Sequence, residues 1–423
     1  MTASPAAAAA PAYPEPARVR RLRLAGEACL VLLPILMWLA NRSAPLLLGL
    51  GAAAYLAAVL AAGEGRALAG RLRALLGTPP ALALGCFLFW ALLSIGWSHD
   101  RPGSLRAYGE LVLPLGFALL IAASGRFRPS PGFWRALALA LILAGAMMVV
   151  ELASGLSQRA ALGTGKLMGF VFNRPMIVLM VLVLPTVQAL WSRPGAALAD
   201  RGLAVICVLV VTFCVFRSES EAAKLGLAVA WACWLGAALL PRLSRITVAT
   251  AFVATMAIAP AIGPLADKAL PKAVVTSFDE MSSRARIDIW QSFGEVATAR
   301  PVTGTGFGSA ASMQNNRVVA EVSHEHRAML AAGHPHDMPL QSWVETGLVG
   351  ATLLTVAGLL ALRGLAGLSA RDLAPRLALF AGAFSVATVG HGAWQGWWIA
   401  ALALAVLLFT HDIRPGPERD GDG

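Results

Sequence analysis

Long apolar runs limit the possible folds of this 423-residue chain more than any other feature. A helix that crosses a bilayer needs about 20 mostly apolar residues, or fewer where polar groups at its ends reach the interface. Twelve such runs can be drawn: 24–40, 44–62, 80–97, 111–123, 133–152, 167–191, 202–216, 222–240, 246–265, 340–362, 374–389 and 393–409. The sequence therefore predicts an all-α, polytopic membrane protein with about 12 transmembrane helices and one large loop that contains short helices.

The composition excludes both a soluble fold and a disordered chain. Hydrophobic residues make up 57% of the sequence and charged residues only 13%, compared with roughly 25% charged residues in soluble proteins. One or two ordinary cores could not bury so much apolar surface. The net charge of +11 would suggest nucleic-acid binding in a soluble protein, but membrane proteins concentrate Lys and Arg in cytoplasmic loops. We therefore expect membrane lipids around the chain and no nucleic-acid partner.

The basic residues are distributed unevenly between the two sides of the predicted helices. Nineteen arginines fall in the tails and short loops on the side of the N-terminus. Outside the long loop, only seven basic residues lie on the opposite side: Arg42, Arg101, Arg106, Arg159, Lys166, Arg217 and Lys224. Because positive residues mark the cytoplasmic side, both termini are predicted to be cytoplasmic. The long loop then faces the other side, which is the periplasm in a Gram-negative bacterium.

This topology divides the chain into five parts. They are a cytoplasmic N-terminal tail (1–23), helices one to nine (24–265), the large periplasmic loop (266–339), helices ten to twelve (340–409) and a cytoplasmic C-terminal tail (410–423). Asn41 and Arg42 follow the first run where a signal peptide would have small residues, so this run is expected to be an anchor. The five cysteines fall inside predicted helices, without histidines at metal-ligand spacing, and are expected to pack.

Histidines gather on the predicted periplasmic side, where six of the seven lie: His99, His324, His326, His334, His336 and His391. Histidine is the natural proton acceptor at neutral pH because its unperturbed pKa is about 6.5. The strongest local pattern starts at His334. Asp337 is a good N-cap and Pro339 is tolerated in a first turn, so the tenth helix should begin here. The positive end of that helix would keep His336 neutral, although histidines in a loop are often simply solvated.

A second pattern consists of Arg286, Trp290 and Phe293, which are spaced for one face of a helix. Such a helix could present Arg286 above an aromatic surface that lies against the membrane, and a guanidinium matches phosphate well. The downstream Gly304-Thr305-Gly306 is typical of a turn and, without a preceding strand, does not support a dinucleotide site. The alternative is an interfacial helix whose arginine contacts lipid headgroups.

Other cations near the periplasmic face are less distinctive. Arg217 and Lys224 could meet a diphosphate at the membrane surface, but they could equally pair with Glu219 and Glu221, which the local sequence favours. Arg174 lies about two turns inside the sixth run. A charge at that depth is costly unless it faces water or a partner, or extends outward to the interface.

These motifs resemble the O-antigen ligase and polymerase superfamily. The similar elements are Arg286-x-x-x-Trp290, then Gly304-x-Gly306, and His336 followed at a fixed spacing by Gly347-x-x-Gly350, within roughly residues 216–355. The His-to-Gly element is most similar to that of the ligase branch, whose motif usually has Asn, Ser or Gln after the histidine. Asp337 stands there in this chain.

A second departure concerns the cation of the periplasmic connection. Ligases often show a Ser-Arg dipeptide at the start of a helix similar to 222–240, whereas Ser220 is followed by Glu221 in this chain. That leaves Arg217 and Lys224 as substitutes.

The resemblance implies a glycosyltransferase of lipopolysaccharide biosynthesis in the bacterial inner membrane, with its active site facing the periplasm. The donor would be O-antigen linked to undecaprenyl diphosphate and the acceptor a hydroxyl of lipid A-core. His336 would act as general base and Arg286 would stabilise the leaving diphosphate. The further diphosphate-binding candidates are Arg217, Lys224 and Arg174, and the supporting candidates are His334, Asp337 and Trp290.

One-step displacement would invert the anomeric centre. No cofactor or metal is expected, because the acidic pair Asp279-Glu280 is adjacent rather than spaced for metal binding. An O-antigen polymerase or a protein O-oligosaccharyltransferase would use the same type of donor and remains an alternative. From a different class, a transporter of lipid-linked glycans typically carries repeats and charged residues near the bilayer midplane.

Overall fold

The computed structural model describes residues 15–163, 167–193, 195–269 and 280–410, and within these ranges every regular element is helical. Eleven helical segments are long and apolar enough to cross a membrane. Their main helices are α1 (Ala17–Leu39), α2 (Ala44–Ala61), α4 (Pro79–Ser94), α5 (Arg101–Ser124), α6 (Pro131–Ala153), α8 (Asn173–Ser192), α9 (Leu198–Arg217), α10 (Glu221–Leu239), α11 (Pro241–Ile258), α15 (Met338–Gly364) and α16 (Ala370–Val389). A shorter apolar helix, α17 (Gly396–Thr410), follows. The expected class, an all-α polytopic membrane protein, is confirmed.

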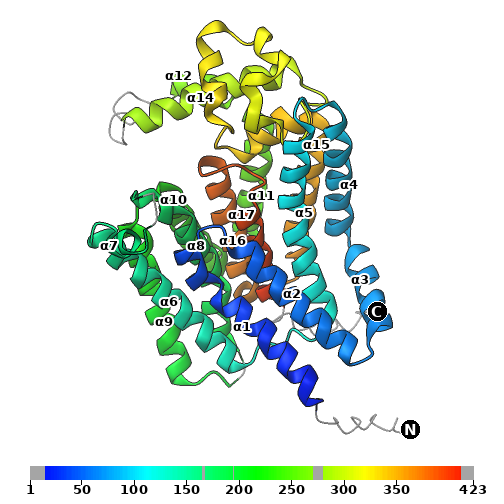
Figure 1. Ribbon diagram of the computed structural model, residues 1–423, viewed down its shortest axis with the longest axis vertical. Helices are drawn as coiled ribbons and strands as arrows, with labels where there is room; N and C mark the ends of the chain where they lie inside the picture. The colour runs from blue at the N-terminus through cyan, green and yellow to red at the C-terminus, as the bar shows by residue number, and fades with distance from the viewer. Residues whose placement is uncertain (1–14, 164–166, 194, 270–279, 411–423) are drawn as a thin grey trace.

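Short helices occupy most of the long segment between α11 and α15. They are α12 (Ile262–Ala269), α14 (Glu280–Ala299) and the 3₁₀ helices η4 (Ser309–Asn315), η5 (Arg317–Glu321) and η6 (His324–Ala332). Figure 1 shows this segment lying across one end of the helix bundle. We refer to residues 280–335 as the cap. Two other short helices, α3 (Gly65–Leu76) and α7 (Ser157–Ala161), lie outside it.

Several elements differ from their expected bounds. Helix α5 begins at Arg101, ten residues before the predicted run, because the Asp100 carboxylate caps it by accepting from the N–H of Gly103 (3.0 Å). The ninth run bends instead of continuing: α11 ends at Ile258 and a 3₁₀ turn that contains Pro260 connects it to α12. Proline lacks the N–H that a continuous helix needs there.

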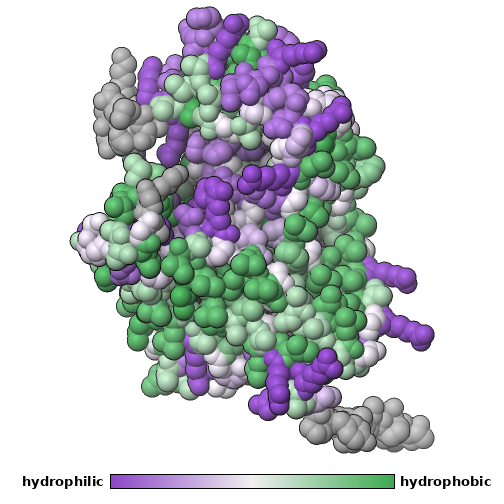
Figure 2. Space-filling model, in the orientation of Figure 1, coloured by the Kyte–Doolittle hydropathy of each residue, from purple (hydrophilic) through white to green (hydrophobic). Residues whose placement is uncertain are grey.

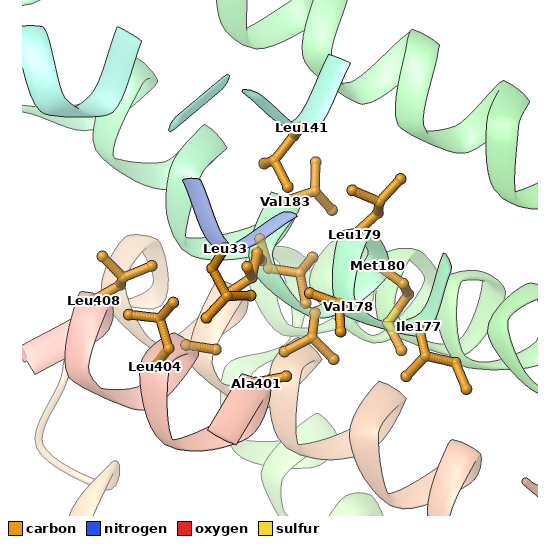
Figure 3. Packing of buried hydrophobic residues seen from close by; sticks show 14 of the residues in the cluster. Leu33, Leu141, Ile177, Val178, Leu179, Met180, Val183, Ala401, Leu404 and Leu408 are labelled. Carbon is orange, nitrogen blue, oxygen red and sulfur yellow. The ribbon is translucent and has the colours of Figure 1, made fainter. Parts of the chain in front are cut away.

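Helix α8 is the centre of the bundle. Its residues are mostly apolar, and all of those from Pro175 to Leu190 are buried, which is typical of a helix enclosed by other helices. Figure 3 shows Val178 and Met180 of α8 among side chains of three other helices, including Leu33 of α1, Leu141 of α6 and Leu404 of α17. The N-terminal end of α8 is therefore held rigidly at the end of the bundle nearest the cap.

The surface separates by polarity along the long axis of the molecule. Figure 2 shows apolar side chains covering the helical bundle on this face and hydrophilic side chains over the cap. Hydrophilic side chains also lie between the cap and the apolar region. Hydrophilic groups of this face thus cover the cap and its junction with the bundle, and others lie at the opposite end of the bundle.

The cap has its own hydrophobic core, which it shares with the first turns of α15. Phe293 and Val296 of α14 are fully buried together with Met313, Leu330 and Val344. The expectation that Phe293 forms an aromatic surface against the membrane is therefore wrong. The face of α14 that carries Phe293 instead packs against the rest of the cap and the first turns of α15, inside the protein.

Helix α15 is broken at Gly347, where φ is +63° and ψ is −167°. In a regular helix the N–H of Leu348 would donate to the carbonyl of Val344. Instead, it donates to the carbonyl of Pro301 (2.8 Å), and the carbonyl of Val344 accepts from the N–H of Thr305 (2.8 Å). The chain between Pro301 and Thr305 thus fills the break.

The glycines of the two motifs allow this close approach of backbones. A Cβ on Gly347 would lie 2.2 Å from the carbonyl oxygen of Val302, and one on Gly304 would lie 2.5 Å from the carbonyl carbon of Glu345. Both glycines also have φ in the left-handed region, which favours glycine. The spacing of these glycines therefore encodes a backbone insertion into a broken helix.

Gly347→Ala should destabilise the protein, because alanine meets both backbone strain, about 1–3 kcal/mol, and the carbonyl of Val302. We expect a lower melting temperature of the detergent-solubilised protein and a smaller monodisperse fraction by size-exclusion chromatography. Gly364→Ala in the same helix is the matched control, since a Cβ there meets nothing within 4 Å. Equal melting temperatures for the two variants would contradict the insertion.

Candidate active site

The loop from His334 to Asp337 joins the cap to α15 and positions the central histidine. The Asp337 carboxylate accepts from the N–H of Leu340 (2.7 Å), so Asp337 caps α15 and the predicted helix start is confirmed. The indole N–H of Trp290 donates to the carbonyl of Pro335 (3.0 Å). Held from both sides, His336 has a φ of +54°, an uncommon conformation for a residue other than glycine.

A hydrogen bond sets the tautomer of His336. Its Nδ1 lies 3.0 Å from the carbonyl oxygen of Gly390, in the loop between α16 and α17. A carbonyl oxygen only accepts, so Nδ1 carries the proton. In the neutral ring, Nε2 then keeps its lone pair and is able to accept a proton.

The surroundings of His336 favour that neutral ring. Burial lowers the pKa of His336, and the positive charge of Arg286 lowers this pKa further, although the hydrogen bond to Gly390 opposes both. Arg286 is half-buried on α14 and has no ion-pair partner among the described residues. Its neighbour Arg284 lies 3.9 Å from Asp267 instead. The cap thus brings Arg286 into electrostatic range of His336, two residues that the sequence separates by fifty positions.

Two more histidines belong to this cluster. The rings of His334 and His336 are 4.1 Å apart, and Gly392 packs closely against the ring of His334. Burial, with the charges of His336, His391 and Arg174, lowers the pKa of His334 to about 3. Burial also lowers the pKa of His391 to about 4, with a smaller contribution from Arg174. All three rings are therefore neutral at physiological pH.

His391 is the member of the cluster for which no role was predicted from the sequence. It lies 55 residues beyond His336, which is too far for any local motif. The helices α15 and α16 lie between the two residues in the chain, so only the fold places His391 near His336. The segment His391–Gln395 between α16 and α17, followed by Trp397 and Trp398, is the feature that distinguishes this loop. Two other histidines form hydrogen bonds with the cap: His99 contacts Ser312 and Asn316, and His326 contacts Glu295.

Arg174 joins the cluster from α8. It lies in the first turn of that helix, so the expectation that it sits two turns inside is wrong, because residues 169–172 form a 3₁₀ turn and not the start of α8. Its guanidinium lies over the ring of Trp397, 5.8 Å from the ring centre. The arginine charges that act on the three histidines come from Arg174 and Arg286.

The remaining candidates lie near the start of α10. Lys224 forms an ion pair with Glu221 (2.8 Å), which is the local pairing that the sequence favoured over diphosphate binding. Arg217 is exposed at the end of α9. Ala222 approaches the cluster, because a Cβ on Gly390 would lie 3.4 Å from its Cβ.

A buried carboxylate holds the loops of the site together. Glu345 lies in α15, fully buried, and accepts hydrogen bonds from the N–H of Gly308 (2.7 Å), the amide of Gln341 (2.8 Å) and the indole N–H of Trp394 (2.7 Å). Gln341 in turn accepts from the N–H of Ala393 (2.9 Å). Glu345 therefore joins the chain after the cap helix α14 to the loop that carries His391. No local motif marks Glu345, because Gly308 and Trp394 are distant from it in the sequence.

The fold and the cluster define a class of protein: a multi-pass helical membrane protein with a polar, titratable site where a cap meets the end of its bundle. Residues 205–355 match the family model described as O-antigen ligase, and this match supports membership in the O-antigen ligase superfamily. The match includes Arg286, His336 and the glycines of the broken helix, while Arg174 and His391 lie outside it. A search of curated proteins found no match. The family implies glycosyl transfer in general.

Glu345→Gln should lower the melting temperature, because the amide N–H₂ of glutamine is a donor. It would face one of the groups that now donate a hydrogen bond to the carboxylate. Each hydrogen bond to a charged group contributes about 1.5–3 kcal/mol. Thermal unfolding in detergent measures the loss. Glu325→Gln, at an exposed position of the cap, is the control and should leave the melting temperature unchanged; the same result for Glu345→Gln would contradict its joining role.

Proposed function

We propose that this protein is an O-antigen ligase. It transfers a finished glycan from undecaprenyl diphosphate to a sugar hydroxyl of lipid A-core, in the bacterial inner membrane, with the cap and the site on the periplasmic side and both termini in the cytoplasm. The observation that carries the proposal is the neutral His336, whose Nε2 lone pair lies within the electrostatic reach of an arginine without an ion-pair partner in the described chain. A basic lone pair and a cation match an acceptor hydroxyl and a diphosphate leaving group.

His336 acts as the general base. A sugar hydroxyl has a high pKa and is a poor nucleophile, so its attack on the anomeric carbon needs a positioned proton acceptor. Nε2 takes the proton as the new glycosidic bond forms and the bond from the anomeric carbon to the diphosphate oxygen breaks. The imidazolium that results keeps its Nδ1–H on the carbonyl of Gly390, whose dipole stabilises the positive charge. Direct displacement inverts the anomeric centre.

Arg286 and Arg174 bind the diphosphate. Negative charge develops on the leaving oxygen as the bond breaks, and guanidinium groups stabilise it through paired, charge-assisted hydrogen bonds. The two side chains come from different parts of the molecule, the cap and the central helix α8, which suits a group held between them. Arg217 at the end of α9 and Lys224 near the start of α10 are weaker candidates. His334, Asp337 and Trp290 support the loop that carries the base.

The first test replaces the base. His336→Ala should reduce glycan attachment to lipid A-core by about 100-fold or more, the usual contribution of a general base, while the protein still inserts and accumulates. His324→Ala, an exposed cap histidine, is the control. Reconstitution with undecaprenyl-diphosphate glycan measures the transfer, and unchanged attachment in His336→Ala would disprove the assignment.

The same reconstitution separates the alternatives. Lipid A-core, a second lipid-linked glycan and a protein are offered as acceptors in parallel, so that a ligase, a polymerase and a protein O-oligosaccharyltransferase give different products. Movement of the donor across the vesicle membrane without any product would indicate a transporter. A chelator added to each reaction tests metal independence, which remains a prediction.

Arg286 should affect both donor binding and pH dependence. Arg286→Lys keeps the charge but loses the paired hydrogen bonds, so we expect about a tenfold loss of kcat/KM for the donor, equivalent to about 1.4 kcal/mol, with an unchanged pH profile. Arg286→Gln removes a charge that lowers the pKa of His336. The base then protonates more readily, and the acidic limb of kcat/KM should move to higher pH. Full activity of Arg286→Lys would contradict specific diphosphate recognition.

A further inference from the structure

His391 has a buried nitrogen that the mechanism above does not use. The side chain is only 8% exposed, and its Nδ1 lies 2.9 Å from the carbonyl oxygen of Gly392. Nδ1 therefore carries the proton and Nε2 keeps its lone pair. Within the described part of the chain, Nε2 is buried and has no hydrogen-bond partner. A buried acceptor without a donor costs about 1–3 kcal/mol, so a bound group that supplies a donor would recover that free energy.

The chemistry of Nε2 limits what that group can be. A neutral imidazole nitrogen that keeps its lone pair can only accept, so its partner must supply an O–H or N–H. The oxygens of an ionised diphosphate have no hydrogen to give, so the lone pair repels them. The positive charge of Arg174 also opposes protonation of His391, which would otherwise turn it into an anion-binding group. The partner of Nε2 is therefore a neutral hydrogen-bond donor such as a sugar hydroxyl.

One indole places this acceptor beside a cation. The ring of His391 packs edge-on against Trp397, with ring centres 4.7 Å apart, and the guanidinium of Arg174 lies over the same indole. Trp397 is itself buried, and its N–H donates to the side-chain oxygen of Gln395 (2.6 Å). If a ligand contacts Arg174 through a phosphate, the group attached to that phosphate therefore lies near His391.

We propose that His391 binds a hydroxyl of the sugar that is attached directly to the diphosphate of the donor. The proposal rests on the proposed function, in which Arg174 binds that diphosphate. Nε2 accepts the hydroxyl hydrogen, and Arg174 and His391 together distinguish a glycosylated donor from the bare polyprenyl diphosphate that leaves after transfer. His391 is a substrate-binding residue, distinct from the base His336.

The test compares two substitutions in the reconstituted full-length protein. His391→Phe keeps a ring against Trp397 but removes the acceptor, and His391→Gln restores an oxygen acceptor. For each variant we would measure KM for undecaprenyl-diphosphate glycan, KM for lipid A-core, and the inhibition constant of undecaprenyl diphosphate without a sugar. His391→Phe should raise the donor KM about tenfold, the effect of one lost hydrogen bond, and leave the other two constants unchanged. His391→Gln should recover most of the donor KM.

Arg174→Gln is the matched control and should weaken the glycosylated donor and the bare diphosphate alike. A parallel rise of both constants in His391→Phe would overturn the proposal, because the residue would then act through Trp397 and Arg174. An unchanged donor KM, as expected for an ordered water at Nε2, or a change in the lipid A-core KM alone, would also overturn it. If the phenylalanine variant does not accumulate, His391→Asn, which is too short to reach the Nε2 position, replaces it.

A different result would contradict the proposed function itself: the wild-type protein would transfer glycan to none of the acceptors.

Discussion

The site depends on the broken helix α15 and the chain that fills its break. Two consecutive helical hydrogen bonds, from Leu348 to Val344 and from Val349 to Glu345, are absent at Gly347. The segment from Pro301 to Gly306 replaces them: its carbonyls accept from Leu348 and Val349, and its N–H groups donate to Val344 and Glu345. Every backbone group released by the break is thus paired again, as an environment without water requires. A helix interruption near a membrane is stable here because another backbone completes it.

That insertion fixes the distances on which the chemistry depends. The cap is attached to α15 through backbone hydrogen bonds rather than through side-chain packing alone, so α14 and its Arg286 have a fixed position relative to the helix that begins after His336. Glu345, two residues before Gly347, extends the same attachment to Trp394, and the carbonyl of Gly390 in that loop sets the tautomer of His336. Three segments far apart in the sequence therefore determine the protonation of one ring.

The sequence predicted those parts of the molecule that follow from local pattern. Apolar runs identified the helices because hydropathy over twenty residues is a local property, and Asp337 with Pro339 correctly marked the start of α15. The spacing of Phe293 was read as a membrane-facing surface because a helical face does not reveal what covers it. Arg174 was placed too deep because an apolar 3₁₀ turn has the same hydropathy as a helix. His391 and Glu345 were missed because the groups that give them a role, Arg174 for His391 and Gly308 and Trp394 for Glu345, are distant in the sequence.

Arg286 and a bound donor would have opposing effects on the pKa of His336. Without an anion, the charge of Arg286 lowers the pKa of His336 and makes the ring a weak base. A diphosphate bound between Arg286 and Arg174 would neutralise part of that charge, so the pKa of His336 would rise toward its ordinary value. Because a general base works best when its pKa is near the working pH, His336 would become an effective base only when the donor is in place. The free enzyme would then have little tendency to deprotonate an acceptor, or water, before the glycan arrives.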